Sequence, residues 1–290
     1  MITDSQVHIW TVSPGESPPS DPQDHQLKHP KGFLAEELIA EMDAIGVDRA
    51  VICPPRAWME TATEYALDAA ARYPGRLAIM DSFDWTGADA RSNFERVRDN
   101  QYILGMRTSV RALANSLDHQ TVRWILGECE REAIPITVLA SGMPAVIVPV
   151  MKRYPRLRMT FDHMARVPDA KGSAAFASLN DLLAFTKYEN VGVKVSSVPD
   201  SSAERYPFPD LYEGVRRIHE AFGARRMLWG SDLSGLSVSY LECLNHFREG
   251  LDFLTEDDKE RILGKALAAI YDWPEGPSNP GRQLEAEGGC

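Results

Sequence analysis

Residues 2–10, ITDSQVHIW, form the first of eight short runs that are rich in apolar and β-branched residues. Runs of this length and composition are typical of strands buried on both faces of a sheet. The other runs share that composition and are 48–54 (DRAVICP), 77–84 (LAIMDSFD), 103–110 (ILGMRTSV), 134–141 (IPITVLAS), 157–164 (LRMTFDHM), 191–198 (VGVKVSSV) and 226–233 (RMLWGSDL). The chain therefore contains eight candidate strands.

Helix-like segments separate these strands. They include residues 34–45, 61–73, 120–133, 144–154, 174–187, 209–223, 238–249 and 255–271. We expect Thr255 to be an N-cap, because acidic residues fill the turn that follows it. Eight strands that each precede a helix predict an α/β fold, a single-domain (β/α)8 barrel of the TIM type over residues 1–273. A doubly wound open sheet is the alternative, although no G-x-G-x-x-G or Walker loop follows any strand.

Two stretches fall outside this alternation. Residues 11–32 (TVSPGESPPSDPQDHQLKHPKG) are polar and rich in proline, and they follow the first strand. Long loops in compact domains tend to be functional or disordered, so we expect a lid over the barrel mouth. Residues 274–290 (PEGPSNPGRQLEAEGGC) are expected to form a disordered tail.

Composition narrows the class of partner. The 290-residue chain has a net charge of −11 at pH 7, which argues against nucleic acid or an anionic membrane as a partner. Its four cysteines include no C-x-x-C pair, so we expect free thiols in a reducing cytoplasm. No stretch reaches the length of a transmembrane helix. We expect a cytoplasmic protein that binds a small molecule, either as a monomer or as a homo-oligomer.

Titratable side chains gather at the ends of the candidate strands. In a TIM-type barrel the active site lies at the C-terminal ends of the strands, so side chains from separate strands meet at one mouth. His8 ends the first strand, His163 the sixth and Asp232 the eighth, which predicts a catalytic cluster of these three. Asp162 lies beside His163, and strand alternation predicts that its side chain points to the opposite face.

Further residues near the same strand ends are candidate substrate contacts. They are polar, cationic or aromatic and comprise Gln6, Trp10, Arg107, Arg111, Arg166, Lys194 and Ser196. Trp10, Trp58, Trp85 and Trp229 would line a flat apolar pocket, with ordinary core packing as the alternative. No G-x-S-x-G motif is present, which disfavours an esterase with a serine nucleophile.

Four motifs in this order resemble a known superfamily. They are DSQVHIW (4–10), FDHMARVP (161–168), VGVKVSS (191–197) and MLWGSDLSG (227–235). Together they resemble the amidohydrolase superfamily over residues 2–271, in the amidohydrolase-related branch of 2-pyrone-4,6-dicarboxylate lactonase-like and sugar-acid lactonase-like proteins. The resemblance implies that Asp232 deprotonates the attacking water, that His8 and His163 polarise the scissile carbonyl or hold a metal, and that Arg107 binds a substrate carboxylate.

The chain also departs from that pattern. Gln6 stands where the family usually has a metal-binding histidine, and the fifth strand supplies no histidine or lysine. The last helix, LGKALAAIY, lacks the Asn-Ala pair that the resemblance leads us to expect. The missing ligands argue against a binuclear centre. A single zinc or manganese ion on His8, His163 and Asp232 stays open, since catalytic zinc needs only three protein ligands. We expect either no cofactor or one weakly bound divalent ion.

Metal-free hydrolysis would place two demands on these groups. Asp232 could act as a general base if burial raised its pKa towards the working pH. Donors must also meet the developing oxyanion, and the candidates are the Gln6 amide, protonated His8 or His163, and Lys194. The alternative for Gln6 is a structural hydrogen bond. Such a site suits an activated ester such as a lactone better than an unactivated amide.

The sequence therefore predicts a hydrolase in aromatic or sugar-acid catabolism. It would open a lactone or cleave an activated carboxylic ester of a small molecule that bears a carboxylate. One alternative is a decarboxylase or hydratase of the same superfamily, which would normally need a tightly bound metal. The second alternative is a small-molecule binding barrel without catalytic activity.

Overall fold

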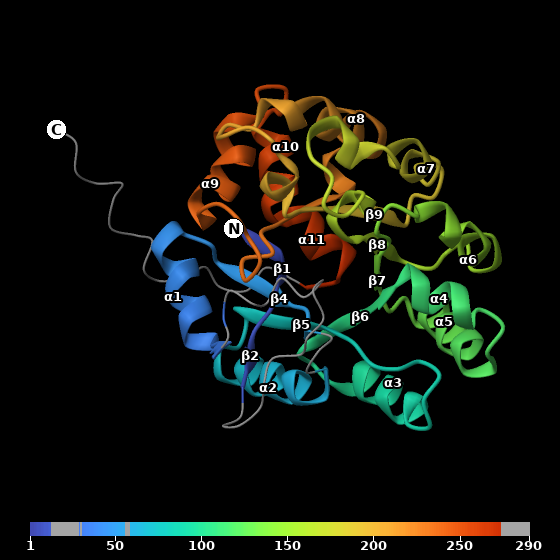
Figure 1. The fold of residues 1–290 in the computed structure, drawn as a ribbon. Helices are drawn as coiled ribbons and strands as arrows, with labels where there is room; N and C mark the ends of the chain where they lie inside the picture. The colour runs from blue at the N-terminus through green and yellow to red at the C-terminus, as the bar shows by residue number, and fades with distance from the viewer. Residues whose placement is uncertain (13–28, 30, 56–58, 274–290) are drawn as a thin grey trace.

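Eight parallel strands form one sheet in the computed structural model (Figure 1). The structure describes residues 1–12, 29, 31–55 and 59–273. In sheet order the strands are β1 (Thr3–Val7), β4 (Arg49–Ile52), β5 (Leu77–Asp81), β6 (Ile103–Ser109), β7 (Ile136–Leu139), β8 (Met159–Phe161), β9 (Val191–Ser196) and β10 (Met227–Gly230). Each strand pairs with the next one along the chain, as crossover helices require.

The first and last strands of the sheet meet at a seam. The backbone N–H of Asp232, just after β10, donates to the carbonyl oxygen of Gln6 on β1 at 2.8 Å. Gly230 lies so close to β1 that a Cβ atom there would stand 2.6 Å from Ser5 Oγ. The sheet is therefore a nearly closed single-domain (β/α)8 barrel, as predicted, and the open-sheet alternative is wrong.

Helices surround the barrel on its outside (Figure 1). The α-helices are α1 (Ala35–Ile45), α2 (Met59–Arg72), α3 (Ala90–Asp99), α4 (Val110–Ser116), α5 (Gln120–Glu132), α6 (Val148–Arg153), α7 (Leu179–Leu183), α8 (Tyr212–Phe222), α9 (Tyr240–Asn245), α10 (Glu256–Glu260) and α11 (Ala266–Ile270). Short 3-10 helices are η3 (Pro144–Ile147), η4 (Asp162–Ala165), η5 (Gly172–Phe176), η6 (Val198–Ser201), η7 (Pro209–Leu211) and η8 (Ala224–Arg226). Two π-helical turns are η9 (His246–Gly250) and η10 (Arg261–Lys265).

The predicted helices lie at the expected positions, but several of them are not continuous α-helices. The predicted helix 255–271 is a succession of α10, η10 and α11, and Thr255 caps it by accepting a hydrogen bond from the Asp258 N–H. Helices α3 and α4 have no counterpart among the predicted segments. In α3 only Ala90, Phe94 and Val97 are buried, so its apolar stripe is thin against many polar residues.

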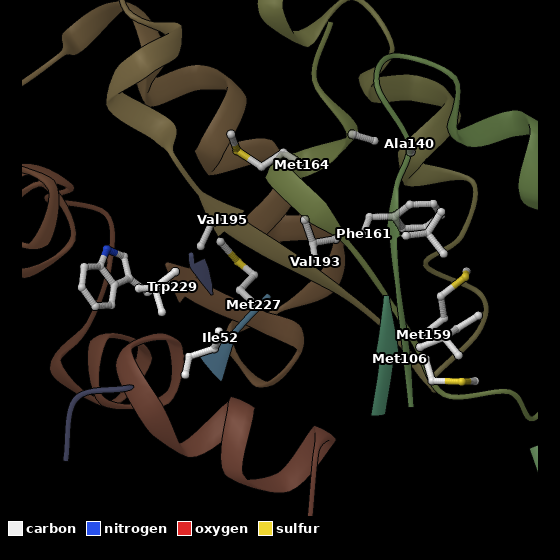
Figure 2. Close-up of a cluster of buried hydrophobic side chains, with 14 of the residues drawn as sticks. Ile52, Met106, Ala140, Met159, Phe161, Met164, Val193, Val195, Met227 and Trp229 are labelled. Atoms are coloured by element: carbon white, nitrogen blue, oxygen red, sulfur yellow. The ribbon is translucent and has the colours of Figure 1, made fainter. Parts of the chain in front are cut away.

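Two layers of apolar side chains stabilise the barrel. Outward-facing strand residues such as Ile52, Phe161 and Val193 pack against the helices and form the larger core (Figure 2). A smaller cluster contains the inward-facing Val51 and Leu228, and it is covered by Leu267 of α11 and by Tyr271, which directly follows that helix. Alternation along each strand separates these layers and leaves the remaining inward positions to polar residues.

The predicted loop 11–32 begins and ends in a small ladder. Strands β2 (Trp10–Thr11) and β3 (Gly32–Phe33) pair in antiparallel fashion, so the predicted strand 2–10 is two strands interrupted at His8 and Ile9. At Gly32, φ is +95° and a Cβ atom would stand 2.5 Å from Trp10 O, which only glycine tolerates. Most of the proposed lid (residues 13–28 and 30), Trp58 and the tail 274–290 lie outside the described residues.

Within the described ranges no helix has both the length and the apolar character that a membrane crossing requires.

Candidate active site

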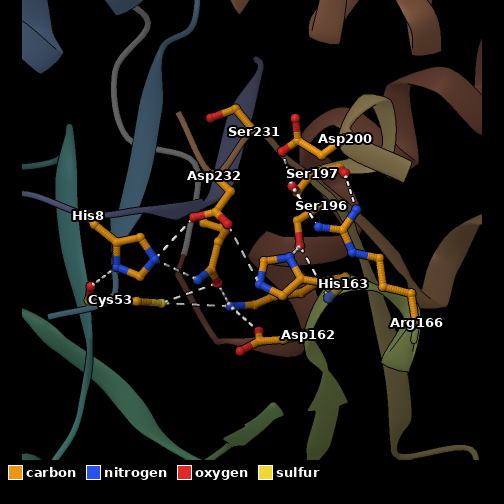
Figure 3. A network of polar contacts seen from close by, with 12 residues as sticks. His8, Cys53, Asp162, His163, Arg166, Ser196, Ser197, Asp200, Ser231 and Asp232 are labelled. Carbon is orange, nitrogen blue, oxygen red and sulfur yellow. Dashed lines mark hydrogen bonds and ion pairs between the residues drawn. The ribbon is translucent and has the colours of Figure 1, made fainter. Parts of the chain in front are cut away.

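Three of the predicted side chains meet at the C-terminal mouth of the barrel. His8 follows β1, His163 lies in η4 directly after β8, and Asp232 follows β10 (Figure 3). The exposed fractions of these side chains are only 11%, 12% and 14%, so each one is largely shielded from water. The predicted convergence of the three strand ends is therefore present.

Left-handed backbone at two strand ends aims these side chains. β8 ends at Phe161, and the next residues leave the strand, with φ of +50° at His163. Asp232 has φ of +57°. Non-glycine residues rarely adopt this conformation, and it is common at functional sites. The prediction that Asp162 points away is wrong, because Phe161 faces outward and alternation then places Asp162 inside the barrel. His163 departs from alternation instead, so both side chains lie on the inner side. The side chain of Asp162 lies below His163 (Figure 3).

Both imidazoles turn Nε2 towards one carboxylate. His8 Nε2 lies 3.0 Å from Asp232 Oδ1, and His163 Nε2 lies 3.8 Å from Asp232 Oδ2. The other ring nitrogens are held from behind. His8 Nδ1 donates to the carbonyl oxygen of Cys53 at 2.5 Å, and His163 Nδ1 lies 2.9 Å from Ser196 Oγ. These supporting bonds fix the ring orientations before any substrate arrives.

The protonation of Asp232 differs from the sequence-based expectation. Burial alone would raise its pKa, as we expected from the sequence, but the hydrogen bond and charge of His8, aided by His163 and Arg107, hold the pKa well below its usual range. Asp232 is therefore ionised in the free enzyme, and the hydrogen between Oδ1 and His8 Nε2 belongs to the imidazole. Burial lowers the pKa of His163 to about 4, so that ring is neutral near pH 7.

A buried ion-pair cluster lies beneath the mouth. Asp162 accepts from Arg107 Nε at 2.8 Å and from Thr137 Oγ1 at 2.9 Å, and its Oδ1 lies 3.2 Å from Lys194 Nζ. Burial alone would raise the pKa of Asp162, but Lys194 and Arg107 hold it well below its usual range. One carboxylate thus lies between two cations. The terminal nitrogens of Arg107 have no hydrogen-bond partner among the described residues.

Gln6 lies between this cluster and the imidazole of His8. Its Oε1 accepts from Lys194 Nζ at 2.9 Å and from Cys53 Sγ at 3.3 Å. The amide nitrogen therefore faces the other way, 3.4 Å from His8 Nε2. Gln6 and Lys194 have no exposed surface. A substrate at the mouth therefore cannot touch Gln6 or Lys194 directly, contrary to our prediction. Both residues instead contact other residues of the site, Gln6 at His8 and Lys194 at Asp162.

The remaining predicted contacts fall into separate groups. Trp10 and Ser196 are fully buried, and Ser196 supports His163. Arg166 is partly buried and binds the loop after β9, through the carbonyl oxygen of Ser197 at 2.9 Å. Arg111 is exposed on α4. Of the tryptophans, Trp229 is fully buried and Trp85 is 5% exposed, so core packing describes both.

Sequence reasoning missed two supports of the site. The Cys53 carbonyl that holds His8 is a backbone group, and no residue pattern identifies it. The ion pair of Arg107 with Asp162 was detectable in principle, because Arg107 on β6 and Asp162 after β8 both face the barrel interior, on either side of β7. The expectation that Asp162 points outward concealed it.

The donors at the mouth do not fit the single zinc or manganese ion that the sequence left open. Among the described residues, no group of three or more His, Cys, Asp or Glu side chains is arranged to hold a metal ion. His8 Nε2 and Asp232 are bonded to each other. The side-chain oxygen of Gln6, which stands in place of the missing histidine, is turned to the ammonium group of Lys194. The ammonium group of Lys194 therefore already lies on the inner side of Gln6.

Comparison with known proteins gives three informative similarities. The L-fucono-1,5-lactonase of Burkholderia ambifaria is 27% identical over 256 residues, which cover 83% of this chain and 86% of that protein. A solved amidohydrolase structure from Burkholderia multivorans with bound zinc has a TM-score of 0.78 at 18% identity and covers 94% of this chain and 100% of its own. A probable 2-pyrone-4,6-dicarboxylic acid hydrolase from Acinetobacter baumannii with citric acid bound has a TM-score of 0.73 at 17% identity, covering 93% and 99%. At these identities the two solved structures show a common fold.

The family model agrees with the strand-end motifs. The family model described as Amidohydrolase matches residues 3–273, which include all eight strands of the barrel and the three residues at its mouth. The chain therefore matches the family model although it lacks a histidine at Gln6 and a histidine or lysine on the fifth strand. The resemblance seen in the sequence is confirmed, and this protein belongs to the amidohydrolase family.

Proposed function

We propose that this protein is a hydrolase that opens the ring of a small lactone, with water activated by Asp232. One observation carries the proposal: two imidazole Nε2 atoms face a single buried carboxylate, at 3.0 Å and 3.8 Å, at the mouth of the barrel. Ester hydrolysis needs a base for water and donors for the carbonyl oxygen, and this arrangement supplies both. The similarity to an L-fucono-1,5-lactonase supports a cyclic ester as the substrate.

His8 supplies the donor to the carbonyl oxygen. Its Nδ1 donates to the Cys53 carbonyl, and its Nε2 hydrogen points at Asp232 Oδ1 in the free enzyme. A lactone carbonyl that accepts this hydrogen takes the place of Asp232. Asp232 then loses the bond that holds its pKa down, and it becomes more basic when the substrate arrives. The pair thus couples substrate binding to activation of the base.

His163 supplies a second, neutral donor. Ser196 Oγ accepts from the backbone N–H of His163 at 3.3 Å, which leaves the Ser196 hydroxyl hydrogen for His163 Nδ1. In that tautomer Nε2 carries the ring hydrogen and directs it at the mouth. Because the pKa of His163 is lowered to about 4, this assignment holds across the neutral pH range.

The reaction balances with these groups. Asp232 takes a proton from water as the water oxygen bonds to the lactone carbonyl carbon. The resulting oxyanion accepts hydrogen bonds from Nε2 of His8 and His163. When the ring C–O bond breaks, the proton on Asp232 passes to the leaving ring oxygen, and the product is a hydroxy acid. No step is assigned to a metal, because the donors at the mouth do not fit one.

Arg107 is the proposed anchor for a carboxylate on the substrate. Its side chain is 8% exposed, its Nε is bonded to Asp162, and its terminal nitrogens have no hydrogen-bond partner among the described residues. A guanidinium held in this way can still present its outer edge to a carboxylate oxygen.

Turnover of lactones tests the function. We expect purified enzyme to release acid from a panel of aldonolactones and carboxylated lactones, and Asp232→Asn to lower kcat by about 100-fold to 10,000-fold. The control Asp257→Asn removes an exposed carboxylate on α10 and should keep full activity. Equal activity of Asp232→Asn and wild type would refute the role of Asp232. Carbon dioxide release from carboxylated substrates without lactone opening would favour the decarboxylase instead.

A further inference from the structure

One buried carboxylate near the site has no part in the reaction described above. Asp4 lies on β1 with no exposed surface. Its Oδ1 accepts from the N–H groups of Gln6 at 3.0 Å and Ser231 at 2.9 Å. Its Oδ2 accepts from Ser231 Oγ at 2.5 Å and from Tyr240 OH at 2.8 Å. Among the described residues, no Lys, Arg or His forms an ion pair with Asp4, so these four hydrogen bonds stabilise its charge.

The contacts of Asp4 lie across the seam of the barrel. β1 and β10 do not pair as a regular ladder, although the Asp232 N–H donates to Gln6 O at 2.8 Å. Asp4 is on one side of this seam, and Ser231 is on the other, directly before Asp232. The carboxylate binds both the backbone and the side chain of Ser231. It therefore fixes the start of the left-handed turn that aims Asp232 at His8.

We propose that ionised Asp4 is a positioning residue for lactone opening, because it holds the turn from Ser231 to Asp232 in the geometry that the base needs. This inference rests on the proposed function. Asp4 does not touch the reacting atoms and acts through Ser231. When Asp4 is protonated, one oxygen becomes a donor and faces hydroxyl groups that themselves donate. The clamp on Ser231 then loosens, and the carboxylate of Asp232 is less well placed.

The surroundings of Asp4 set the pH at which this change occurs. Burial raises its pKa to about 6, although the bonds from Ser231, Gln6 and Tyr240 oppose the rise. The titratable groups packed against it are Tyr240 and Cys243 of α9, and burial raises the pKa of both, so they are neutral near pH 7. Asp232 and His163 titrate at lower pH. Asp4 therefore predicts an acidic limb near pH 6 in kcat/KM, which reports the pKa values of the free enzyme.

Two substitutions test the role of Asp4. Asp4→Asn keeps the shape of the side chain and resembles the protonated form at every pH. We expect its kcat at pH 7.5 to fall about tenfold, which corresponds to the free energy of one charge-assisted hydrogen bond. KM should stay unchanged, and the acidic limb near pH 6 should be absent. The midpoint of its urea denaturation at pH 7.5 should not fall, because the variant no longer buries a charge without a cation partner.

Tyr240→Phe removes one donor to the ionised form of Asp4. The pKa of Asp4 should then rise, and the acidic limb should move to higher pH by about half a unit to one unit. Tyr154→Phe is the matched control, since its hydroxyl donates to the Arg123 carbonyl away from the site. An acidic limb at the same pH in wild type, Tyr240→Phe and Tyr154→Phe would overturn the proposal, as would an unchanged kcat of Asp4→Asn.

A second readout does not depend on activity. Hydrogen–deuterium exchange of residues 228–235, measured by mass spectrometry, reports the bonds of the Ser231 and Asp232 amides. We expect faster exchange in Asp4→Asn than in wild type after correction for pH, and a loss of wild-type protection below pH 6. If wild type opens no lactone but shows this pattern, the proposed function fails while Asp4 still holds the turn. Unchanged exchange in Asp4→Asn would refute the clamp itself.

Discussion

At the scale of single residues, the centre of the barrel holds buried ionisable groups of both charge signs. Asp162 lies between Lys194 and Arg107, and Asp232 is bonded to His8 above them. Such pairs are costly to bury and strongly destabilising to break, because a lone charge is then left in a medium of low polarity. The pKa of Asp232 is low because of the hydrogen bond and charge of His8, with further contributions from His163 and Arg107.

The role of Arg107 gives a prediction at this scale. Arg107→Lys keeps the charge beside Asp162 but loses the forked outer edge. We expect KM to rise at least about tenfold for lactones that bear a carboxylate, and to change little for neutral aldonolactones, since only the former need the fork. Steady-state kinetics on matched substrates measure this, with Arg158→Lys on the outer surface as the control. A similar rise in KM for both substrate types would show that Arg107 does not recognise a carboxylate.

Residue types alone identified the three side chains of the mouth but not their protonation. His8, His163 and Asp232 follow from their places at strand ends. The pKa of Asp232 could not be predicted in the same way, because burial and the bond to His8 act in opposite directions. Only the 3.0 Å contact between the two side chains shows which effect prevails.

At the scale of elements, all eight strands lie where the sequence predicts them. The differences arise where strands end. β8 stops at Phe161, and the left-handed backbone within η4 turns His163 to the inner side, where Asp162 already lies. β1 stops at Val7, and a two-stranded ladder follows at Trp10. Apolar periodicity extends past the last paired residue, so it predicts the strand but not the residue at which the strand ends. The side chains of the site lie on the turns that follow these strand ends.

Two glycines in helical segments give a matched prediction. A Cβ atom added at Gly127 in α5 would have no neighbouring atom nearer than 3.9 Å, so Gly127→Ala should raise the free energy of unfolding by about 0.5–1 kcal/mol. Gly264 in η10 differs, because a Cβ there would stand 2.2 Å from Met1 O. Gly264→Ala should lower the free energy of unfolding by about 1–3 kcal/mol. Urea denaturation checks both signs, and a stabilised Gly264→Ala protein would contradict the close approach of η10 to the N-terminus.

At the scale of the whole molecule, buried histidines make stability depend on pH. Burial lowers the pKa of His163 and of His246 to about 4. A lowered histidine pKa contributes stability above the unfolded value of 6.5, and this contribution is lost as the pH falls from 6.5 to 4. Asp4 acts in the opposite sense, because its raised pKa favours folding at low pH.

We therefore expect the midpoint of urea denaturation to fall between about pH 7 and about pH 4.5. His246 is packed among Phe208, Tyr212 and Phe247, away from the mouth. His246→Phe should flatten the pH dependence, since the histidine contributes about 3 kcal/mol across its shift. The exposed His119 gives the control, His119→Gln, which should keep the wild-type slope. If His246→Phe kept the full slope, the pH dependence would have another origin.

The fold and family follow from patterns that span the whole chain, whereas the supports of the site are local and come from long-range contacts. Eight alternating strands and helices are sufficient to predict the barrel. No such pattern places the Cys53 carbonyl behind His8, or Asp4 across the seam, because each contact joins residues far apart in the sequence. Those contacts form only in the folded barrel, so they cannot be inferred from the sequence.

The hydrogen bond from Lys194 to Gln6 has an evolutionary consequence. Gln6→His alone would restore the imidazole that the family pattern leads one to expect, but it would remove one of the two oxygen acceptors of a fully buried ammonium group. Lys194→Met alone would leave Asp162 with one fewer cation. Each single step thus passes through a less stable protein. The two changes together avoid the cost at the ammonium group, and Arg107 then remains as the cation partner of Asp162. Positions 6 and 194 are therefore expected to change in concert.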